Sequence, residues 1–262
     1  MGSFEDRFVG FVDILGFRDI VGRLQDDSAL FETVRDALVA IDNRAKQLES
    51  YRRLCTEPVS SHRVSSLSPN DVRMTAFSDC YLISDSASED SSPWLLMAAV
   101  QALASHLLAK GVLTRGALVR GKAYHDDRVS FGPAIIEAYE IEQTVAHFPR
   151  IVVTDPVRTA ISWENETFWN GEMLHQDSDG LWFLNALIPP LSKAESTLTD
   201  TSSMDTVEFL TSLRSVLAEK IESSRAKVRH LSKVGWLVSY FNIAARKHGI
   251  PILDNIAQDP SD

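Results

Sequence analysis

The sequence predicts an α+β domain in which helices cover one face of a mainly antiparallel sheet. The expected elements follow the order strand, helix, helix, strand hairpin, helix, strand, helix, strand, which lacks the regular alternation of a doubly wound parallel sheet. The composition is typical of a folded globular protein, with 44% hydrophobic and 24% charged residues in 262. The length allows one large domain with added segments.

The first half of the chain supplies most of the expected sheet. The apolar run Phe8–Val12 predicts a buried strand, and apolar residues at helical spacing follow it. Strand candidates over Arg73–Phe77 and Tyr81–Ser84 lie so close together that they predict a hairpin. The other elements expected before residue 155 are helices over about 17–24, 30–51, 94–109 and 131–145, and strands over 112–122 and 151–153.

Changes in composition divide the chain into three expected parts. Residues 1–155 hold the sheet and its helices. Residues 156–204 are rich in Trp and Phe, and they predict loops with a short hairpin and a polar linker over 192–204. From about residue 205 to residue 247, apolar stripes recur with a helical period. We therefore expect residues 205–262 to form a C-terminal helical extension.

Charge and targeting signals exclude several functions. The chain has 26 Lys and Arg against 36 Asp and Glu, a net charge of −10, so it repels nucleic acids in bulk. No apolar run approaches the roughly 20 residues of a membrane helix, and the first residues do not resemble a signal peptide. Cys55 and Cys80 lack metal or redox spacing. We expect a cytoplasmic protein with neither a nucleic acid nor a membrane as partner.

Two aspartates lie at positions where the negative charge of a carboxylate needs a compensating cation. Asp13 ends the first strand, in FVDILGF, and Asp79 lies at the hairpin turn, in AFSDCYLIS. Carboxylates at the edge of a sheet interior are costly unless paired, and Mg²⁺ or Mn²⁺ prefers such oxygen ligands. If the first strand lies beside the hairpin, both carboxylates can reach one metal pair. The alternative is that Asp13 caps the next helix and Asp79 is a turn residue.

Two further segments suggest binding of phosphate groups. Residues 14–17, ILGF, lead from the strand into a helix, whose first N–H groups and dipole favour phosphate, and Gly16 permits close approach. Arg120 and Lys122 share one face of a strand and could hold a triphosphate, or they could belong to a solvated face. The sequence His125–Arg128 predicts a polar turn in preference to a metal cluster.

These segments together resemble a known family. FVDILGF, AFSDCYLIS, TRGALVRGKAYHDDRVSFGPAIIEAYEIE and FPRIVV, in this order over residues 8–153, are similar to the catalytic domain of class III nucleotidyl cyclases. The similarity is greater to the bacterial Pycsar pyrimidine cyclases, which make cyclic UMP or cyclic CMP in anti-phage defence. The resemblance implies a ferredoxin-like catalytic domain, and an extension like residues 205–262 is usual in this subgroup.

The resemblance also implies a mechanism. Asp13 and Asp79, with the Ile14 carbonyl, would bind two Mn²⁺ or Mg²⁺ ions, and the N–H groups of Gly16 and Phe17 would bind the phosphates. One ion would activate the ribose 3′-hydroxyl for attack on the α-phosphate, and the other would hold the leaving pyrophosphate. Class III sites form between two catalytic domains, so a homodimer is expected.

Departures from the family pattern bear on substrate and activity. Thr75 and Val129 stand at the two purine-reading positions, and neither suits a purine, which favours a pyrimidine nucleoside triphosphate. Ile136 and Glu140 stand where the family has its transition-state Asn and Arg. Either Arg120, Lys122 or another basic residue replaces that pair, or the domain is an inactive nucleotide-binding module. Tyr51 is a candidate contact to the base or phosphate, or simply a helix end.

The expected function is therefore a uridylate cyclase that converts UTP to 3′,5′-cyclic UMP and pyrophosphate. A cytidylate cyclase acting on CTP is the alternative among active enzymes. The resemblance implies that a separate effector senses the cyclic nucleotide downstream.

Overall fold

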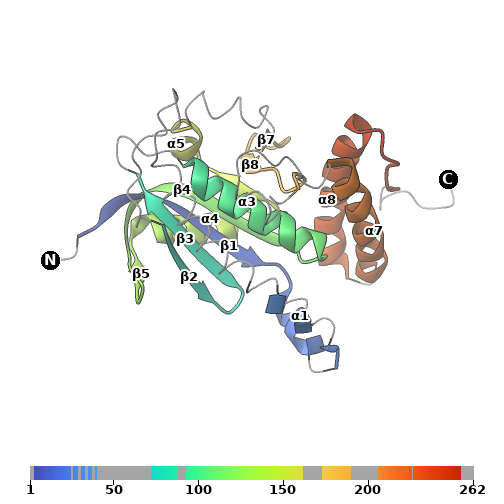
Figure 1. Ribbon diagram of the computed structural model, residues 1–262, viewed down its shortest axis with the longest axis horizontal. Helices are drawn as coiled ribbons and strands as arrows, with labels where there is room; N and C mark the ends of the chain where they lie inside the picture. The colour runs from blue at the N-terminus through green and yellow to red at the C-terminus, as the bar shows by residue number, and fades with distance from the viewer. Residues whose placement is uncertain are drawn as a thin grey trace, which may run out of the picture.

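The computed structural model describes residues 3–24, 26–28, 31–32, 35–36, 39, 72–87, 93–161, 173–189, 206–225 and 227–254. Figure 1 shows a twisted sheet crossed by a long helix, with two further helices side by side at one end. None of the helices in these ranges combines the length and apolarity needed to cross a bilayer.

The sheet is mainly antiparallel. Its strands are β1 (Glu5–Ile14), β2 (Arg73–Phe77), β3 (Cys80–Ser86), β4 (Thr114–His125), β5 (Ser130–Phe131), β6 (Ile151–Val153), β7 (Leu174–Gln176) and β8 (Trp182–Leu184). They lie in the order β2-β3-β1-β4-β6-β8-β7, with β5 paired to β4. Among the described pairs, β4–β6 is parallel and the others are antiparallel. The α+β class predicted from the sequence is confirmed.

The described helices follow the expected spacing closely. They are α1 (Phe17–Leu24), α3 (Trp94–Ala109), α4 (Pro133–Thr144), α5 (Asp155–Arg158), α7 (Thr206–Ser224) and α8 (Val228–Lys247). The last two form the C-terminal helical part that the sequence predicted. Most of the helix expected over 30–51 lies outside the described residues, as do Tyr51 and the linker over 192–204.

Helices cover both faces of the sheet, which corrects the expectation that they cover one. Because strand side chains alternate, Phe8 and Val12 face α3, whereas Val9 faces α4. The face under α4 carries small side chains, including Ala134 and Ala138 of the helix itself, which lets α4 lie close to β4 and β1. Asp13 is an odd-numbered residue of β1, so its side chain belongs to the α4 face.

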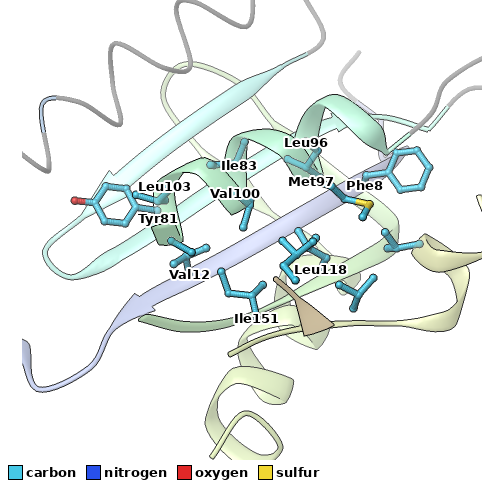
Figure 2. Close-up of a cluster of buried hydrophobic side chains, with 14 of the residues drawn as sticks. Phe8, Val12, Tyr81, Ile83, Leu96, Met97, Val100, Leu103, Leu118 and Ile151 are labelled. Atoms are coloured by element: carbon cyan, nitrogen blue, oxygen red, sulfur yellow. The ribbon is translucent and has the colours of Figure 1, made fainter. Parts of the chain in front are cut away.

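The main core lies between α3 and the sheet. Figure 2 shows Leu96, Met97, Val100 and Leu103 of α3 directed onto strand side chains. The strand residues of this cluster include Phe8, Val12, Ile83, Leu118 and Ile151, which are all buried. Burying an aliphatic or aromatic side chain of this size contributes about 1.5–3 kcal/mol, so this layer holds the central strands in register. It thereby fixes the end of β1, where Asp13 lies, and the start of β3, which Asp79 directly precedes.

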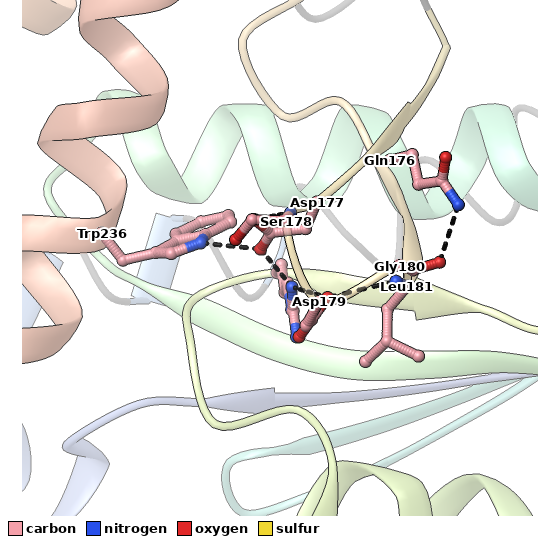
Figure 3. A network of polar contacts seen from close by, with 8 residues as sticks. Gln176, Asp177, Ser178, Asp179, Gly180, Leu181 and Trp236 are labelled. Carbon is pink, nitrogen blue, oxygen red and sulfur yellow. Dashed lines mark hydrogen bonds and ion pairs between the residues drawn. The ribbon is translucent and has the colours of Figure 1, made fainter.

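A second core attaches the C-terminal helices to the rest of the protein. Leu210, Leu213 and Leu217 of α7 pack with Leu108 at the end of α3 and with Phe183 of β8. Polar contacts reinforce this packing. In Figure 3 the Trp236 indole N–H of α8 donates to the Asp177 carboxylate, at a distance of 2.8 Å. The buried Arg150 guanidinium pairs with both Asp177 and Asp179, so α8 is fixed to the turn between β7 and β8.

Local predictions about turns are confirmed. The hairpin β2–β3 turns at Ser78 and Asp79, with Ser78 at φ 57°. At the end of β4, the Asp126 carboxylate accepts hydrogen bonds from the backbone N–H groups of Arg128 and Val129, both at 2.8 Å. The short hairpin expected within 156–204 is β7–β8, and it extends the sheet through pairing of β8 with β6.

Candidate metal and nucleotide site

Backbone pairing brings Asp13 and Asp79 together. In the β1–β3 ladder Asp13 lies opposite Cys80, and the Ile14 N–H donates to the Asp79 carbonyl oxygen at 3.0 Å. Carboxylate oxygens of the two aspartates and the Cys80 Sγ atom all lie within 4.8 Å of one another. The two acidic residues singled out in the sequence therefore share one small volume at the end of β1.

Cys80 lies between the two carboxylates. Its Sγ atom is 3.7 Å from Asp13 Oδ1 and 3.8 Å from Asp79 Oδ1. Burial and the two neighbouring carboxylates raise the pKa of the Cys80 thiol to about 12. The thiol is therefore protonated at neutral pH and donates weakly to the aspartates, so the hard oxygen ligands of this cluster are the two carboxylates.

One guanidinium and a third carboxylate complete the cluster. Arg115 of β4 lies opposite Asp13, with its Nε atom 3.3 Å from Asp13 Oδ2, and its Nη2 atom is 2.5 Å from Glu142 Oε1 of α4. Burial raises the pKa of Asp13, Arg115 opposes that rise, and Asp79 adds to it. Burial likewise raises the pKa of Glu142. Asp13 and Glu142 thus share one guanidinium while the Asp79 carboxylate lies beside Asp13, an excess of negative charge that a divalent cation would offset.

The loop after the aspartate opens the site toward α1. The Leu15 N–H donates to the Leu113 carbonyl oxygen at 2.8 Å, which turns the chain at the end of β1. Gly16 has φ +74°, a left-handed conformation that side chains rarely adopt. Helix α1 begins at Phe17, and the Ile20 N–H bonds the Gly16 carbonyl oxygen at 3.1 Å. The N-terminus of α1 therefore lies beside the acidic cluster, as an anion-binding loop would require.

The structure does not bring Arg120 and Lys122 to this cluster. Their partners in the ladder are Phe8 and Asp6, and five residues of extended strand separate Arg115 from Arg120, which is about 17 Å. The Arg120 guanidinium pairs with the Asp6 carboxylate at 3.0 Å and lies 5.4 Å from the centre of the Phe8 ring. Within one copy of the chain, the two cations lie at the far end of the sheet.

Thr75 belongs to a second polar group on the α4 face. Its hydroxyl lies 2.9 Å from His125 Nε2, and the Ser84 hydroxyl lies 2.8 Å from His125 Nδ1. Burial, followed by the charges of Arg7 and Arg73, lowers the pKa of His125 to about 4. His125 is therefore a neutral, buried residue at the end of β4. The expected polar turn begins directly after it.

The exposed surface of α4 carries the positions that depart from the family pattern. Ile136 is 58% exposed, and Glu140 is also exposed. Val129, at the second expected base-reading position, lies just before β5 and is 49% exposed. All three side chains are thus exposed on the surface of one copy of the chain.

Sequence reasoning missed two members of the site. Glu142 continues the buried stripe of Ala134 and Ala138 at a spacing of four residues, and a glutamate on such a stripe was the available signal. Nothing in the sequence pointed to Lys233 of α8, because its closeness to the cluster depends on how the C-terminal helices pack. Burial and the charge of Arg115 lower its pKa, while Asp13 and Glu142 raise it, so this ammonium lies within the field of the cluster.

Solved structures offer a likeness of fold. The adenylyl cyclase CyaB from P. aeruginosa is 14% identical with a TM-score of 0.44, over 72% of this chain and 98% of that chain. The catalytic core of a rhodopsin-guanylyl cyclase with converted specificity, in complex with ATPαS, is 16% identical with a TM-score of 0.40, over 70% and 97%. No protein-family model and no curated protein matches the sequence. Likenesses this weak say nothing about the activity of this chain.

Proposed function

We propose that this chain is a nucleotidyl cyclase that converts UTP to 3′,5′-cyclic UMP and pyrophosphate. The observation that carries the proposal is the meeting of Asp13 and Asp79 within 4.8 Å, beside the helix-opening loop at Gly16. Clustered carboxylates next to a helix N-terminus suit a metal-bound polyphosphate, because one part holds cations and the other holds anions.

The residues present fit a pair of Mg²⁺ or Mn²⁺ ions. Asp13 and Asp79 would hold them through carboxylate oxygens, with the Ile14 carbonyl as a further oxygen ligand. The three carboxylates of Asp13, Asp79 and Glu142 outnumber the two cations near them, Arg115 and Lys233, which leaves negative charge that such ions would offset. When bound, the ions would lower the pKa of the ribose 3′-hydroxyl and offset charge on the leaving pyrophosphate.

The protein's own groups would position the substrate. Backbone N–H groups of Gly16 and Phe17 would receive the phosphates, while Arg115 holds Asp13 from the side away from Cys80. The ribose 3′-oxygen forms a bond to the α-phosphorus, the bond from that phosphorus to the bridging oxygen breaks, and the hydroxyl proton is released. Thr75, a short side chain beside the neutral His125, suits a pyrimidine because it offers a hydrogen bond without a charge.

The proposed enzyme is a homodimer with composite sites. Four large apolar side chains of β5, α4 and the turn before β5 are about half exposed: Val129, Phe131, Ile136 and Tyr139. An apolar surface of this kind suits contact with a second copy. The catalytic role proposed for Arg120 and Lys122 requires such a partner, because both lie about 17 Å or more along β4 from Arg115.

The wider role follows from the resemblance to Pycsar cyclases. We propose that the cyclic nucleotide is a cytoplasmic signal in anti-phage defence, read by a separate effector protein. This role predicts that the chain acts alone in synthesis and needs no nucleic acid or membrane for turnover.

The experiment is to incubate the purified chain with each of UTP, CTP, ATP and GTP in Mn²⁺ and to identify products by mass. Cyclic UMP with pyrophosphate is the expected result. Cyclic CMP in its place would make the chain a cytidylate cyclase. No cyclic product from any of the four, with nucleotide still bound, would favour the inactive nucleotide-binding module that Ile136 and Glu140 suggest.

A further inference from the structure

A cavity of about 430 Å³ lies between the loop after β1 and the C-terminal helices. Its cationic side chains are Arg18 from α1, Lys220 from α7, Lys233 from α8, and Lys227 and His230 at the start of α8. The part of its wall that the structure describes holds no aspartate or glutamate. In a chain of net charge −10, this local concentration of basic residues favours an anionic ligand.

The cavity adjoins the acidic cluster directly. Leu15 and Gly16, which follow Asp13 by two and three residues, line it. A Cβ atom added at Gly16 would lie 3.4 Å from the His230 ring, so this glycine faces the start of α8. Lys233 belongs to both regions, because it lines the cavity and lies within the field of Asp13 and Glu142.

The C-terminal helices supply most of this charge. Four of the five basic side chains come from α7 and α8 or the residue before α8, and Arg18 alone comes from the sheet domain. In Figure 1 the neighbouring ends of α7 and α8 lie on the same side of the molecule as α1. Lys220 is held in place by a hydrogen bond of 2.6 Å to the Gly111 carbonyl oxygen, just before β4.

We propose that this cavity binds the β- and γ-phosphates of the nucleoside triphosphate, with Lys227, His230 and Arg18 as the contacting side chains. The proposal rests on the proposed cyclase function and extends it, because it makes α7 and α8 part of the substrate site. A metal-bound triphosphate has an anionic end that needs cations and a metal-bearing centre that needs carboxylates. The cavity and the acidic cluster provide these two environments side by side, and about 430 Å³ is within the usual range for small-molecule sites.

The test uses inorganic pyrophosphate with Mg²⁺ as the probe, titrated calorimetrically into the full chain. Lys227→Ala and His230→Ala should each raise the dissociation constant about tenfold, as expected for loss of a hydrogen bond to a charged group. The matched control is Arg246→Ala, which removes one exposed cation from the last turn of α8, about 28 Å from Lys227. The control should bind within twofold of the wild type, and thermal melting should show that all three variants are folded.

The outcomes separate this inference from the cyclase proposal. Pyrophosphate binding that is absent in the wild type, or unchanged in both cavity variants, would overturn the assignment of the cavity, whatever the enzyme makes. If both variants lose binding while no nucleotide yields a cyclic product, the cavity is an anion site and the cyclase proposal fails. If both proposals hold, the KM for UTP should rise about tenfold in each cavity variant, with a smaller change in kcat.

Discussion

The two ends of the β1–β4 strand pair carry charged residues with opposite arrangements. At the Asp13 end, Asp13 and Glu142 share the Arg115 guanidinium, and the Asp79 carboxylate lies beside Asp13 in the same half-buried cluster. At the far end, Arg120 pairs with Asp6 and Arg7 pairs with Glu5, so each of these two guanidinium groups has its own carboxylate. Balanced pairs stabilise a structure modestly, whereas an unbalanced group of buried carboxylates costs stability unless a further cation joins it.

The comparison favours the Asp13 end as the place of the proposed chemistry. Both ends lie on the same two strands, and both contain residues that look catalytic in the sequence. The difference is the excess of negative charge at the Asp13 end. Clusters of like charges that shift one another's pKa are common at binding and catalytic sites. Substitutions at the two ends test whether this difference is real.

The largest expected effect is loss of metal binding when an aspartate of the acidic end is neutralised. Asp13→Asn and Asp79→Asn should each weaken Mn²⁺ binding more than 100-fold, because loss of an outer-shell partner alone typically costs about 10–100-fold. Without metal, Asp13→Asn should melt at the same temperature as the wild type or higher, since burial and Asp79 disfavour the charged form of Asp13. Calorimetric titration with Mn²⁺ and thermal melting measure the two effects.

Asp6→Asn is the control at the balanced end. It removes the carboxylate that pairs with Arg120 and should leave Mn²⁺ affinity unchanged. Equal Mn²⁺ affinity in the wild type and in both acidic-end variants would remove the metal assignment and with it the proposed chemistry.

Sequence patterns were sufficient to select the two aspartates as candidate site residues, because each aspartate interrupts a local pattern. Asp13 follows an apolar strand and Asp79 occupies a hairpin turn, so periodicity alone marked both. Arg115 and Arg120 could not be ranked in the same way. They lie five residues apart on one strand, and the register that places Arg115 opposite Asp13 depends on pairing between residues about 100 positions apart.

The helices were harder still to place. An apolar or alanine-rich stripe shows that a helix is packed, but it does not show which face of the sheet receives it. The prediction that helices cover one face was wrong for this reason, and Glu142 was missed with it. The cavity depends on how α7 and α8 pack against α3 and β8, contacts between segments far apart in the sequence.

The second effect concerns His125, at the balanced end. Its pKa is about 4 when folded and near 6.5 when unfolded, so between these values the unfolded chain binds the additional proton. Stability is therefore complete above about pH 6.5 and falls as the pH is lowered toward 4. The expected loss is about 2 kcal/mol after allowance for solvent screening.

His125→Gln isolates this contribution. Glutamine retains hydrogen-bonding capacity toward Thr75 and Ser84 but does not titrate, so its free energy of unfolding should fall less between pH 7.5 and pH 4.5. Urea denaturation at the two pH values measures the difference. If the free energy of unfolding falls equally in the wild type and the variant between the two pH values, His125 is not held neutral in the folded protein.

The smallest effect is expected for Arg120→Ala. The variant loses a partly exposed ion pair with Asp6 and a contact with the Phe8 ring, which together contribute about 1 kcal/mol. The melting temperature should fall by about 2–4 °C, and Mn²⁺ affinity should not change, because Arg120 lies far along β4 from the acidic cluster. A loss of Mn²⁺ affinity would contradict the separation of the two ends. A large loss of turnover at unchanged Mn²⁺ affinity would instead place Arg120 at the site of a second copy of the chain, which is the arrangement that its proposed catalytic role requires.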